Sequence, residues 1–342
     1  MAKPKPEPNG RKPNRLALLF PGQGAQSSGM GKRLFERSKA ARDVYATADN
    51  TLGFSVTNLC FSGSDQELED TANTQPAIVT TSLAYLADLR ERLQEKGRQL
   101  APSFVAGHSL GQFSAAIAAG TLALTDGLQL VMERGRIMSE WARNRPGGMV
   151  TVLGMDDADI AGVCKDAAPD GSVGVAVYNG NGHTVISGDL GPLAKAMQLA
   201  KERGGRVLRL PIGVPGHTPL MRDAAHELAQ FIEAQPFHNP NPPLVSNITG
   251  KLLTRAEEVR EELSDQVCKA VDWARCVVTM ANQGTGVFLE VGPGLALAKM
   301  VRRITEDTQA LGADQITDEQ LLSLPDVQPI ADAKRAPMQA AR

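Results

Sequence analysis

The chain has 342 residues, of which 22% are charged, and a formal net charge of −2. This balance excludes the strongly basic surface that nucleic-acid binding requires. No apolar run reaches the roughly 18 residues of a membrane span. Residues 1–15 carry Lys, Pro, Arg and Asn without the apolar core of a secretion signal, so we expect a flexible leader there. The length allows one large core, or a large and a small one.

Four cysteines, Cys60, Cys164, Cys268 and Cys276, show neither C-x-x-C spacing nor a histidine at ligand spacing. Such cysteines are typical of ordinary thiols in a reducing compartment. We therefore expect a cytoplasmic protein without a metal site.

The apolar and turn patterns of the first half predict alternating strands and helices. In order they are a strand over 16–20, helices over 32–52 and 76–95, a strand over 104–106, and helices over 112–119 and 126–142. The loop after the first strand places glycines on both sides of Gln23, so its backbone can approach another group closely. Open α/β sheets bind ligands at such strand ends, although a plain Pro-Gly turn is the alternative.

A glycine-bounded serine lies between the strand 104–106 and the helix 112–119. The stretch from Gly107 to Gly111, with Ser109 at its centre, fits the G-x-S-x-G nucleophile elbow. The two glycines leave room that a Cβ would fill, and the free N–H groups of the following helix point to where negative charge would develop. The alternative is a glycine-rich turn with a bystander serine.

An arginine occupies the apolar stripe of the helix 126–142, for which Thr125 is the expected N-cap. Arg134 lies three or four residues from Leu130, Val131 and Met138. A guanidinium on a buried face needs an anionic partner. That partner is either a structural Asp or Glu, or a carboxylate of the substrate, and the spacing does not choose between them.

The middle of the chain predicts an inserted subdomain over 146–211. The expected order is strand 149–153, helix 156–167, strands 173–179 and 184–188, helix 190–203 and strand 206–210. This βαββαβ order is that of a ferredoxin-like unit.

A histidine follows the inserted unit and precedes an expected helix over 219–233. Thr218 suits the N-cap and Pro219 the first helical position. The helix dipole would keep His217 neutral and able to accept a proton, although a lone histidine is more often structural. Strands over 244–248 and 287–291 and a helix over 295–304 follow, and residues 307–342 are expected to form a partly disordered tail.

Seven stretches in order resemble the malonyl-CoA:acyl carrier protein transacylases and the acyltransferase domains of polyketide synthases. They are FPGQGAQ at 20–26, TQPA at 74–77, GHSLG at 107–111, MERG at 132–135, GHTPLM at 216–221, VSN at 245–247 and EVGPG at 290–294. The resemblance covers residues 15 to 305. It implies an α/β fold: a large α/β-hydrolase-like domain with a central, mainly parallel sheet over 16–145 and 212–306, plus the ferredoxin-like subdomain.

The resemblance also implies residue roles. Ser109 is the nucleophile and His217 its base, oriented by main-chain groups rather than by a carboxylate. The backbone N–H groups of Gln23 and Leu110 form the oxyanion hole, and Arg134 binds the free carboxylate of a malonyl group. The remaining substrate-binding positions that it implies are Gln266, Gly216, His108 and Asn247.

The implied reaction moves a malonyl group from malonyl-CoA to the phosphopantetheine thiol of acyl carrier protein through an ester on Ser109. No cofactor is needed, and we expect a monomer. Gly216 stands where the family usually has a larger residue or Ser, which leaves space beside the acyl group and puts strict malonyl selectivity in doubt.

Three other functions remain as alternatives. They are a stand-alone acyltransferase of a polyketide pathway with broader acyl choice, a serine acyl hydrolase or thioesterase, and a non-catalytic module that docks the carrier protein. A hydrolase of the α/β-hydrolase class would need an acid in its triad and would give no reason for Arg134. The intact Ser109, His217 and Arg134 speak against a non-catalytic module.

Overall fold

A six-stranded sheet forms the centre of the protein, in a computed structural model that describes residues 14–330. Its strands, in spatial order, are β12 (Gln309–Gly312), β11 (Thr285–Glu290), β1 (Arg15–Phe20), β3 (Phe104–Gly107), β8 (Leu244–Val245) and β9 (Leu252–Leu253). All neighbours pair in parallel except β8 and β9. The expected α/β fold with a mainly parallel sheet is confirmed.

Strand β1 is buried on both faces. Leu16, Leu18 and Phe20 belong to one hydrophobic cluster, and the alternate residues Ala17 and Leu19 belong to another on the opposite face. This alternation explains why the strand is a continuous apolar run. Phe20 lies in register with Gly107 of β3, so the loops after both strands leave the same edge of the sheet.

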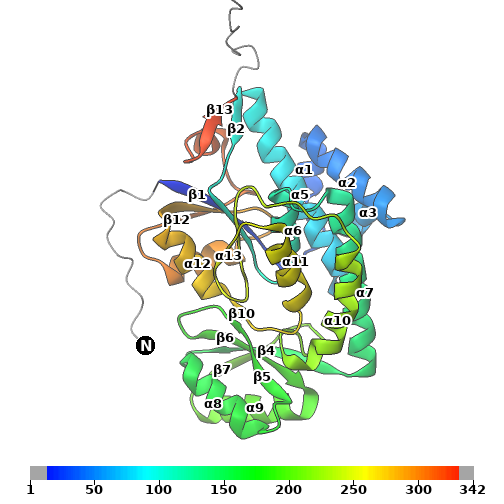
Figure 1. Cartoon of the computed structure of the whole chain (residues 1–342), viewed down its shortest axis with the longest axis vertical. Helices are drawn as coiled ribbons and strands as arrows, with labels where there is room; N and C mark the ends of the chain where they lie inside the picture. Colours follow the sequence, from blue (N-terminus) through cyan, green and yellow to red (C-terminus); the bar gives the residue numbers. More distant parts are fainter. Residues whose placement is uncertain (1–13, 331–342) are drawn as a thin grey trace, which may run out of the picture.

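Helices cover both faces of this sheet (Figure 1). They are α1 (Lys32–Arg37), α2 (Lys39–Leu52), α3 (Val56–Ser62), α4 (Asp65–Glu69), α5 (Thr71–Glu95), α6 (Gly111–Ala118), α7 (Leu124–Asn144), α10 (Arg222–Glu233), α11 (Ala256–Asp265), α12 (Trp273–Asn282), α13 (Ala296–Ile304) and α14 (Asp318–Leu322). The long helices α5 and α7 pack against each other and against α2.

A second sheet with its own core lies beside the main body, and Figure 1 shows α8 and α9 on its outer side. Its elements are β4 (Gly147–Leu153), α8 (Asp157–Ala167), β5 (Val173–Tyr178), β6 (His183–Asp189), α9 (Leu190–Glu202) and β7 (Arg206–Arg209). The spatial order is β10-β5-β6-β4-β7. Strand β10 (Val271–Asp272) comes from the main domain and pairs in parallel with β5, so the second sheet includes residues beyond 146–211.

Two helices begin earlier than predicted. Helix α5 starts at Thr71, where the Asp70 carboxylate accepts a hydrogen bond from the Ala72 amide, and it contains Pro76. Packing of α5 therefore overrides the usual preference of proline for the first turn. Helix α7 starts at Leu124, so Thr125 lies inside it and is not its N-cap.

Three further boundaries differ from expectation. The helix expected over 32–52 is divided at Ser38, whose hydroxyl accepts from the Ala41 amide and caps α2. The strand expected over 244–248 ends at Val245. The helix expected over 219–233 begins as a short 3-10 turn, η1 (Pro219–Met221), and the Thr218 hydroxyl donates to the Pro215 carbonyl instead of capping.

Residues 307–330 are part of the main domain and not a tail, which corrects the sequence prediction. Strand β12 extends the central sheet, and β13 (Val327–Pro329) pairs with β2 (Arg98–Leu100). The Asp326 carboxylate accepts from the Leu16 amide at 2.9 Å and so holds the start of β1. The strands here are three or four residues long, too short to give a periodic signal. The first 13 and last 12 residues lie outside the described residues.

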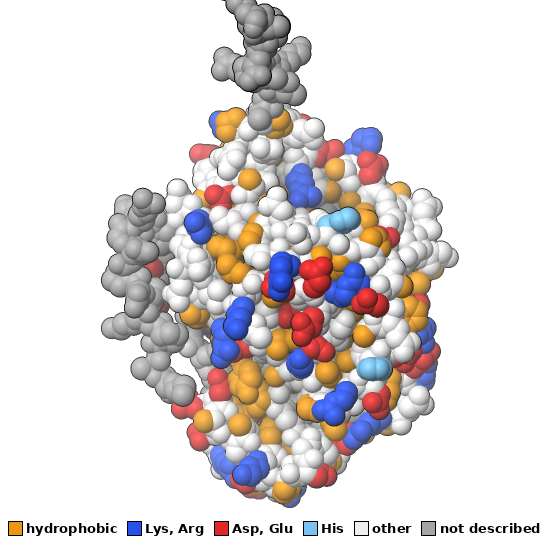
Figure 2. Space-filling view, viewed as in Figure 1, with side chains coloured by type: hydrophobic (Ala, Val, Ile, Leu, Met, Phe, Trp, Pro, Cys, Tyr) orange, Lys and Arg blue, Asp and Glu red, His pale blue; other side chains and the backbone are white. Residues whose placement is uncertain are grey.

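Between residues 14 and 330, no helix is long and apolar enough to span a membrane. The same residues contain no group of three or more His, Cys, Asp or Glu side chains that could hold a metal ion. Figure 2 shows charged side chains of both signs close together across one face of the molecule.

Candidate active site

Ser109 sits on a strained turn between β3 and α6. Its φ is 52°, in the left-handed region that costs a non-glycine residue roughly 1–3 kcal/mol. A Cβ on Gly107 would lie 1.9 Å from the Gly111 backbone, and one on Gly111 would lie 2.1 Å from the Phe20 carbonyl oxygen. The predicted need for glycine at both positions is confirmed, and the turn has the geometry of a nucleophile elbow.

His217 meets Ser109 across the site. The Ser109 Oγ and the His217 Nε2 are 2.7 Å apart, and the His217 Nδ1 is 2.6 Å from the main-chain oxygen of Gln266. A carbonyl oxygen only accepts, so Nδ1 carries the proton and Nε2 is free to accept the one on Oγ. Gln266 is the C-cap of α11, where helix carbonyls lack helical partners.

Burial lowers the pKa of His217 to about 4, and the positive charge of Arg134 is the second cause. The ring is 6% exposed. The segment over 219–233, whose helix dipole is expected from the sequence to keep this ring neutral, begins with the short 3-10 turn η1. Burial and Arg134 therefore keep the base neutral and able to accept a proton at neutral pH.

The lowered pKa predicts an unusually acidic limit for the reactivity of Ser109. The rate of reaction with a fluorophosphonate, which carries no group that titrates near this range, should fall by half near pH 4 and not near 6.5, the usual value for histidine. Intact-mass spectrometry at each pH measures this rate. A midpoint between pH 6 and 7 would contradict the burial argument. Because the folded pKa lies below the unfolded one, this group also removes stability as pH falls from about 6.5 towards 4.

Two backbone amides, one in the elbow and one in the loop after β1, have no hydrogen-bond partner among residues 14–330. In the described part of the chain, the backbone N–H groups of Leu110 and Gln23 donate no hydrogen bond. A Cβ on Gly22 would lie 3.6 Å from the Leu110 nitrogen and 2.3 Å from the His108 carbonyl oxygen, so the loop that carries Gln23 packs directly against the elbow. The geometry can hold two donors beside Ser109.

Arg134 is buried, with 2% of its surface exposed, and burial lowers its pKa to about 10, so it stays charged at neutral pH. One nitrogen donates to the Gln75 side-chain oxygen at 2.7 Å, and the guanidinium lies 5.7 Å from the Phe113 ring centre. Its Nε has no partner. No carboxylate among residues 14–330 forms an ion pair with it. Of the two partners that the sequence allowed for Arg134, the structural Asp or Glu is therefore not found in the described residues.

The other predicted substrate-binding residues divide into two pairs. Gln266 is fully buried with both amide atoms unpartnered, and Gly216 next to His217 has only the Met149 sulfur within 3.5 Å of an added Cβ. Asn247 and His108 instead bond to the protein. The Asn247 carboxamide bonds to the elbow backbone, and His108 Nε2 is 3.0 Å from Oδ1 of Asn179, the residue after β5. Both side chains therefore have protein partners in this structure, and their predicted contact with substrate stays a prediction.

Three buried polar residues next to the site have no role predicted from the sequence, although Gln112 stands where the resembling family commonly has Glu. Gln75 binds Arg134, while Gln112 and Glu262 lie behind the elbow. Gln75 lies within the TQPA stretch, which marked a similarity but no role. Glu262 is one of many acidic residues on a helix that the sequence did not predict, so no local pattern marked it.

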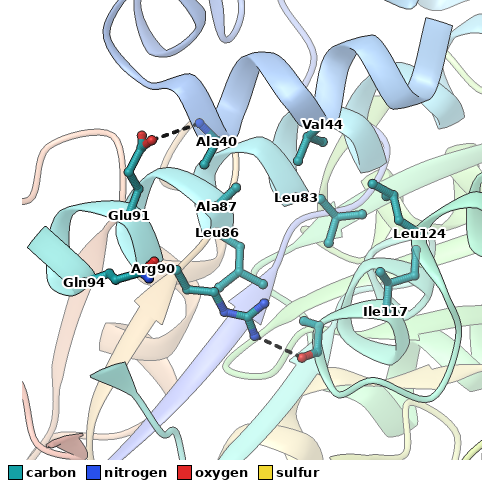
Figure 3. Close-up of a pocket in the computed structure, with 11 residues that line it drawn as sticks. Ala40, Val44, Leu83, Leu86, Ala87, Arg90, Glu91, Gln94, Ile117 and Leu124 are labelled. Carbon is teal, nitrogen blue, oxygen red and sulfur yellow. Dashed lines mark hydrogen bonds between the residues drawn. The ribbon is translucent and has the colours of Figure 1, made fainter. Parts of the chain in front are cut away.

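A cavity of about 370 Å³ lies at a different place, between α2, α5 and the C-terminal end of α6 (Figure 3). Arg90 crosses it to donate to the Ala118 carbonyl at 3.3 Å. No residue of the site described above lines this cavity.

The elbow serine, its histidine and the two free amides form the arrangement that is typical of serine enzymes. The family model described as "Acyl transferase domain" matches residues 17–338. The chain belongs to this acyl transferase family. The match includes residues 307–330, which the sequence analysis had placed in a tail.

Relatives cover most of the chain. The malonyl CoA-acyl carrier protein transacylase of Bacillus subtilis is 34% identical over 313 residues, which are 91% of this chain and 96% of that protein. The enzyme of the same name from Escherichia coli is 36% identical over 297 residues, 86% of this chain and 94% of that protein. A solved malonyl-transacylase in complex with its type II PKS acyl-carrier protein is similar with a TM-score of 0.84 and 34% identity, covering 91% of this chain and 99% of that one.

Proposed function

We propose that this acyltransferase moves a malonyl group from malonyl-CoA to the phosphopantetheine thiol of acyl carrier protein, for fatty acid or polyketide synthesis. The observation that carries the proposal is Arg134, a buried cation beside the Ser109–His217 pair with no carboxylate partner in the described chain. A malonyl group supplies the missing carboxylate, and acetyl groups and simple esters do not. The names of the relatives agree with this substrate and partner.

The residues supply each step of two acyl transfers. The Ser109 Oγ attacks the thioester carbonyl while His217 Nε2 takes its proton, and the Leu110 and Gln23 amides stabilise the oxyanion. Collapse expels the CoA thiolate, which recovers the proton from His217. The carrier thiol then gives its proton to His217 and attacks the ester, and Ser109 leaves and regains a proton.

We further propose that no cofactor takes part, because Ser109, His217 and the two amides already provide the nucleophile, the base and the charge stabilisation. Each of these groups comes from one copy of the chain, which supports a monomer. The free thiols of all four cysteines support a cytoplasmic location. The glycine at position 216, where an added Cβ would contact only the Met149 sulfur, supports an acyl choice broader than malonyl alone.

We also infer that the main domain is α/β-hydrolase-like, on the G-x-S-x-G turn between β3 and α6. The strand order β5-β6-β4-β7 with α8 and α9 supports a ferredoxin-like subdomain inserted over 146–211.

Intact-mass spectrometry tests the proposed function. Mixed with malonyl-CoA, the protein should gain one malonyl group, and Ser109→Ala should gain none. Added phosphopantetheinylated carrier protein should then take up the group. An adduct that persists in Ser109→Ala contradicts the nucleophile assignment. Release of free malonate with an unloaded carrier would indicate an acyl hydrolase instead.

A further inference from the structure

We propose that Gln112, Asn247 and Glu262 form a buried polar network, here called the elbow clamp, that holds Ser109 in its reactive geometry. Asn247 is the positioning residue and Glu262 its anchor. The inference rests on the proposed function, since it concerns the reactivity of Ser109. All three residues are at most 5% exposed.

Asn247 bonds to the two peptide groups of the elbow that precede the nucleophile. Its Oδ1 accepts from the Ser109 amide at 2.8 Å, and its Nδ2 donates to the Gly107 carbonyl at 2.5 Å. A single carboxamide thus fixes two peptide groups around the strained turn at Ser109. It also occupies the Ser109 N–H, so the Leu110 N–H is left for the developing oxyanion.

Gln112 fixes the orientation of that carboxamide. Its Oε1 accepts from the Gly107 amide at 2.9 Å and from Asn247 Nδ2 at 3.1 Å, and its Nε2 donates to the Val245 carbonyl at 2.8 Å. Backbone N–H groups only donate and carbonyls only accept, so each side-chain amide has one orientation that satisfies its neighbours. Gly107 is consequently held at both its N–H and its C=O.

Glu262 gathers four donors around one buried carboxylate. They are the Asn247 amide at 2.5 Å, the Ser246 hydroxyl at 2.6 Å, the Ile248 amide at 3.3 Å and Gln112 Nε2 at 3.4 Å. No Lys, Arg or His in the described chain forms an ion pair with Glu262. Burying a carboxylate without a cation costs free energy, and the four hydrogen bonds that it accepts offset this cost. We infer that Glu262 is there to position these donors.

The helix that carries Glu262 also holds the base. Glu262 lies on α11, and the backbone carbonyl oxygen of Gln266, one helical turn further on, accepts a hydrogen bond from His217 Nδ1. The C-terminal end of α11 therefore positions the histidine directly and the serine through Asn247, on the two sides of the 2.7 Å contact between Oγ and Nε2.

Fluorophosphonate labelling tests the clamp without using the malonyl group. Ser109 Oγ attacks phosphorus, fluoride leaves and His217 takes the proton. In Asn247→Asp, an oxygen replaces Nδ2 and faces two other acceptors, the Gly107 carbonyl oxygen and Gln112 Oε1. In Glu262→Leu, the carboxylate that accepts from the Asn247 backbone amide is removed. We expect both to label about tenfold more slowly or worse, because small misplacements of reacting groups cost this much. The kcat for malonyl transfer should fall alike, with the KM for malonyl-CoA within about twofold, since Arg134 is untouched.

Two further variants separate positioning from stability. Glu262→Gln keeps an oxygen for the Asn247 and Ile248 amides and loses only the hydrogen bond from the Ser246 hydroxyl, so its labelling rate should lie closer to wild type than that of Glu262→Leu. Ser114→Ala alters the same helix α6 at a buried hydroxyl outside the network and should label normally. If Glu262→Leu fails to fold, Asn247→Asp decides.

The inference is overturned if folded Asn247→Asp or Glu262→Leu labels as fast as the wild-type protein. It is also overturned if Ser114→Ala labels as slowly as those two variants. A wild-type protein that does not label overturns it together with the nucleophile assignment. A wild-type protein that labels but does not transfer malonyl refutes the proposed function alone, and slower labelling of the variants would still support the clamp.

Discussion

Replacement of Arg134 by alanine should remove most malonyl transfer and leave acetyl transfer intact. The malonyl carboxylate would enter the site without a cation, at a cost of roughly 2–5 kcal/mol by analogy with truncated charge pairs, or about 30- to 5,000-fold in kcat/KM. Acetyl-CoA has no carboxylate and should react as before or better. The melting temperature should hold, because no internal carboxylate in the described chain is left unpaired.

The remaining variants separate charge from packing. Arg134→Lys should rescue malonyl transfer only in part, since an ammonium cannot form a two-pronged pair with a carboxylate. Arg90→Ala is the control, because Arg90 is an arginine outside the site whose side chain donates to a carbonyl, the Ala118 oxygen. Arg90→Ala should leave kcat/KM unchanged for both malonyl and acetyl transfer. Equal losses of malonyl and acetyl transfer, with a lower melting temperature, would refute a role for Arg134 as carboxylate ligand.

The parts of the site that lie in short local patterns could be predicted from the sequence. Ser109 is bounded by the two glycines that the turn requires, and Arg134 interrupts an apolar stripe. His217 was one of five histidines, and its assignment needed the family resemblance as well. The spacing could not show which anion meets Arg134, because that question depends on residues brought together from three helices.

Contacts between distant segments could not be predicted. Glu262 reaches Gln112 across 150 positions of the chain, and Asn247 reaches Gly107 across 140. The resemblance implies that Asn247 binds substrate. The local sequence could not show that both polar atoms of its carboxamide form hydrogen bonds with the elbow backbone. The same holds for β12, which is a strand only because β11 offers it an edge.

Replacement of Gly107 by alanine should destabilise the whole domain. The added Cβ would lie 1.9 to 2.2 Å from three backbone atoms of Gly111 and Gln112, and backbone cannot rotate away as a side chain can. Overpacking alone costs about 1–3 kcal/mol, and a clash with backbone at the centre of the sheet should exceed that range. We expect a much lower melting temperature or the loss of soluble protein, measured by thermal melts and soluble yield.

Gly216→Ala is the matched control, since it adds the same methyl group beside the same site. Its Cβ would meet only the Met149 sulfur, at an ordinary contact distance of 3.5 Å, so the melting temperature should stay within a few degrees of wild type. Gly111→Ala should behave like Gly107→Ala, because its Cβ would lie 2.1 Å from the Phe20 carbonyl oxygen. A Gly107→Ala protein that melts like Gly216→Ala would show that β3 and α6 can separate at the elbow. The close approach of strand and helix would then not be what fixes Ser109 in place.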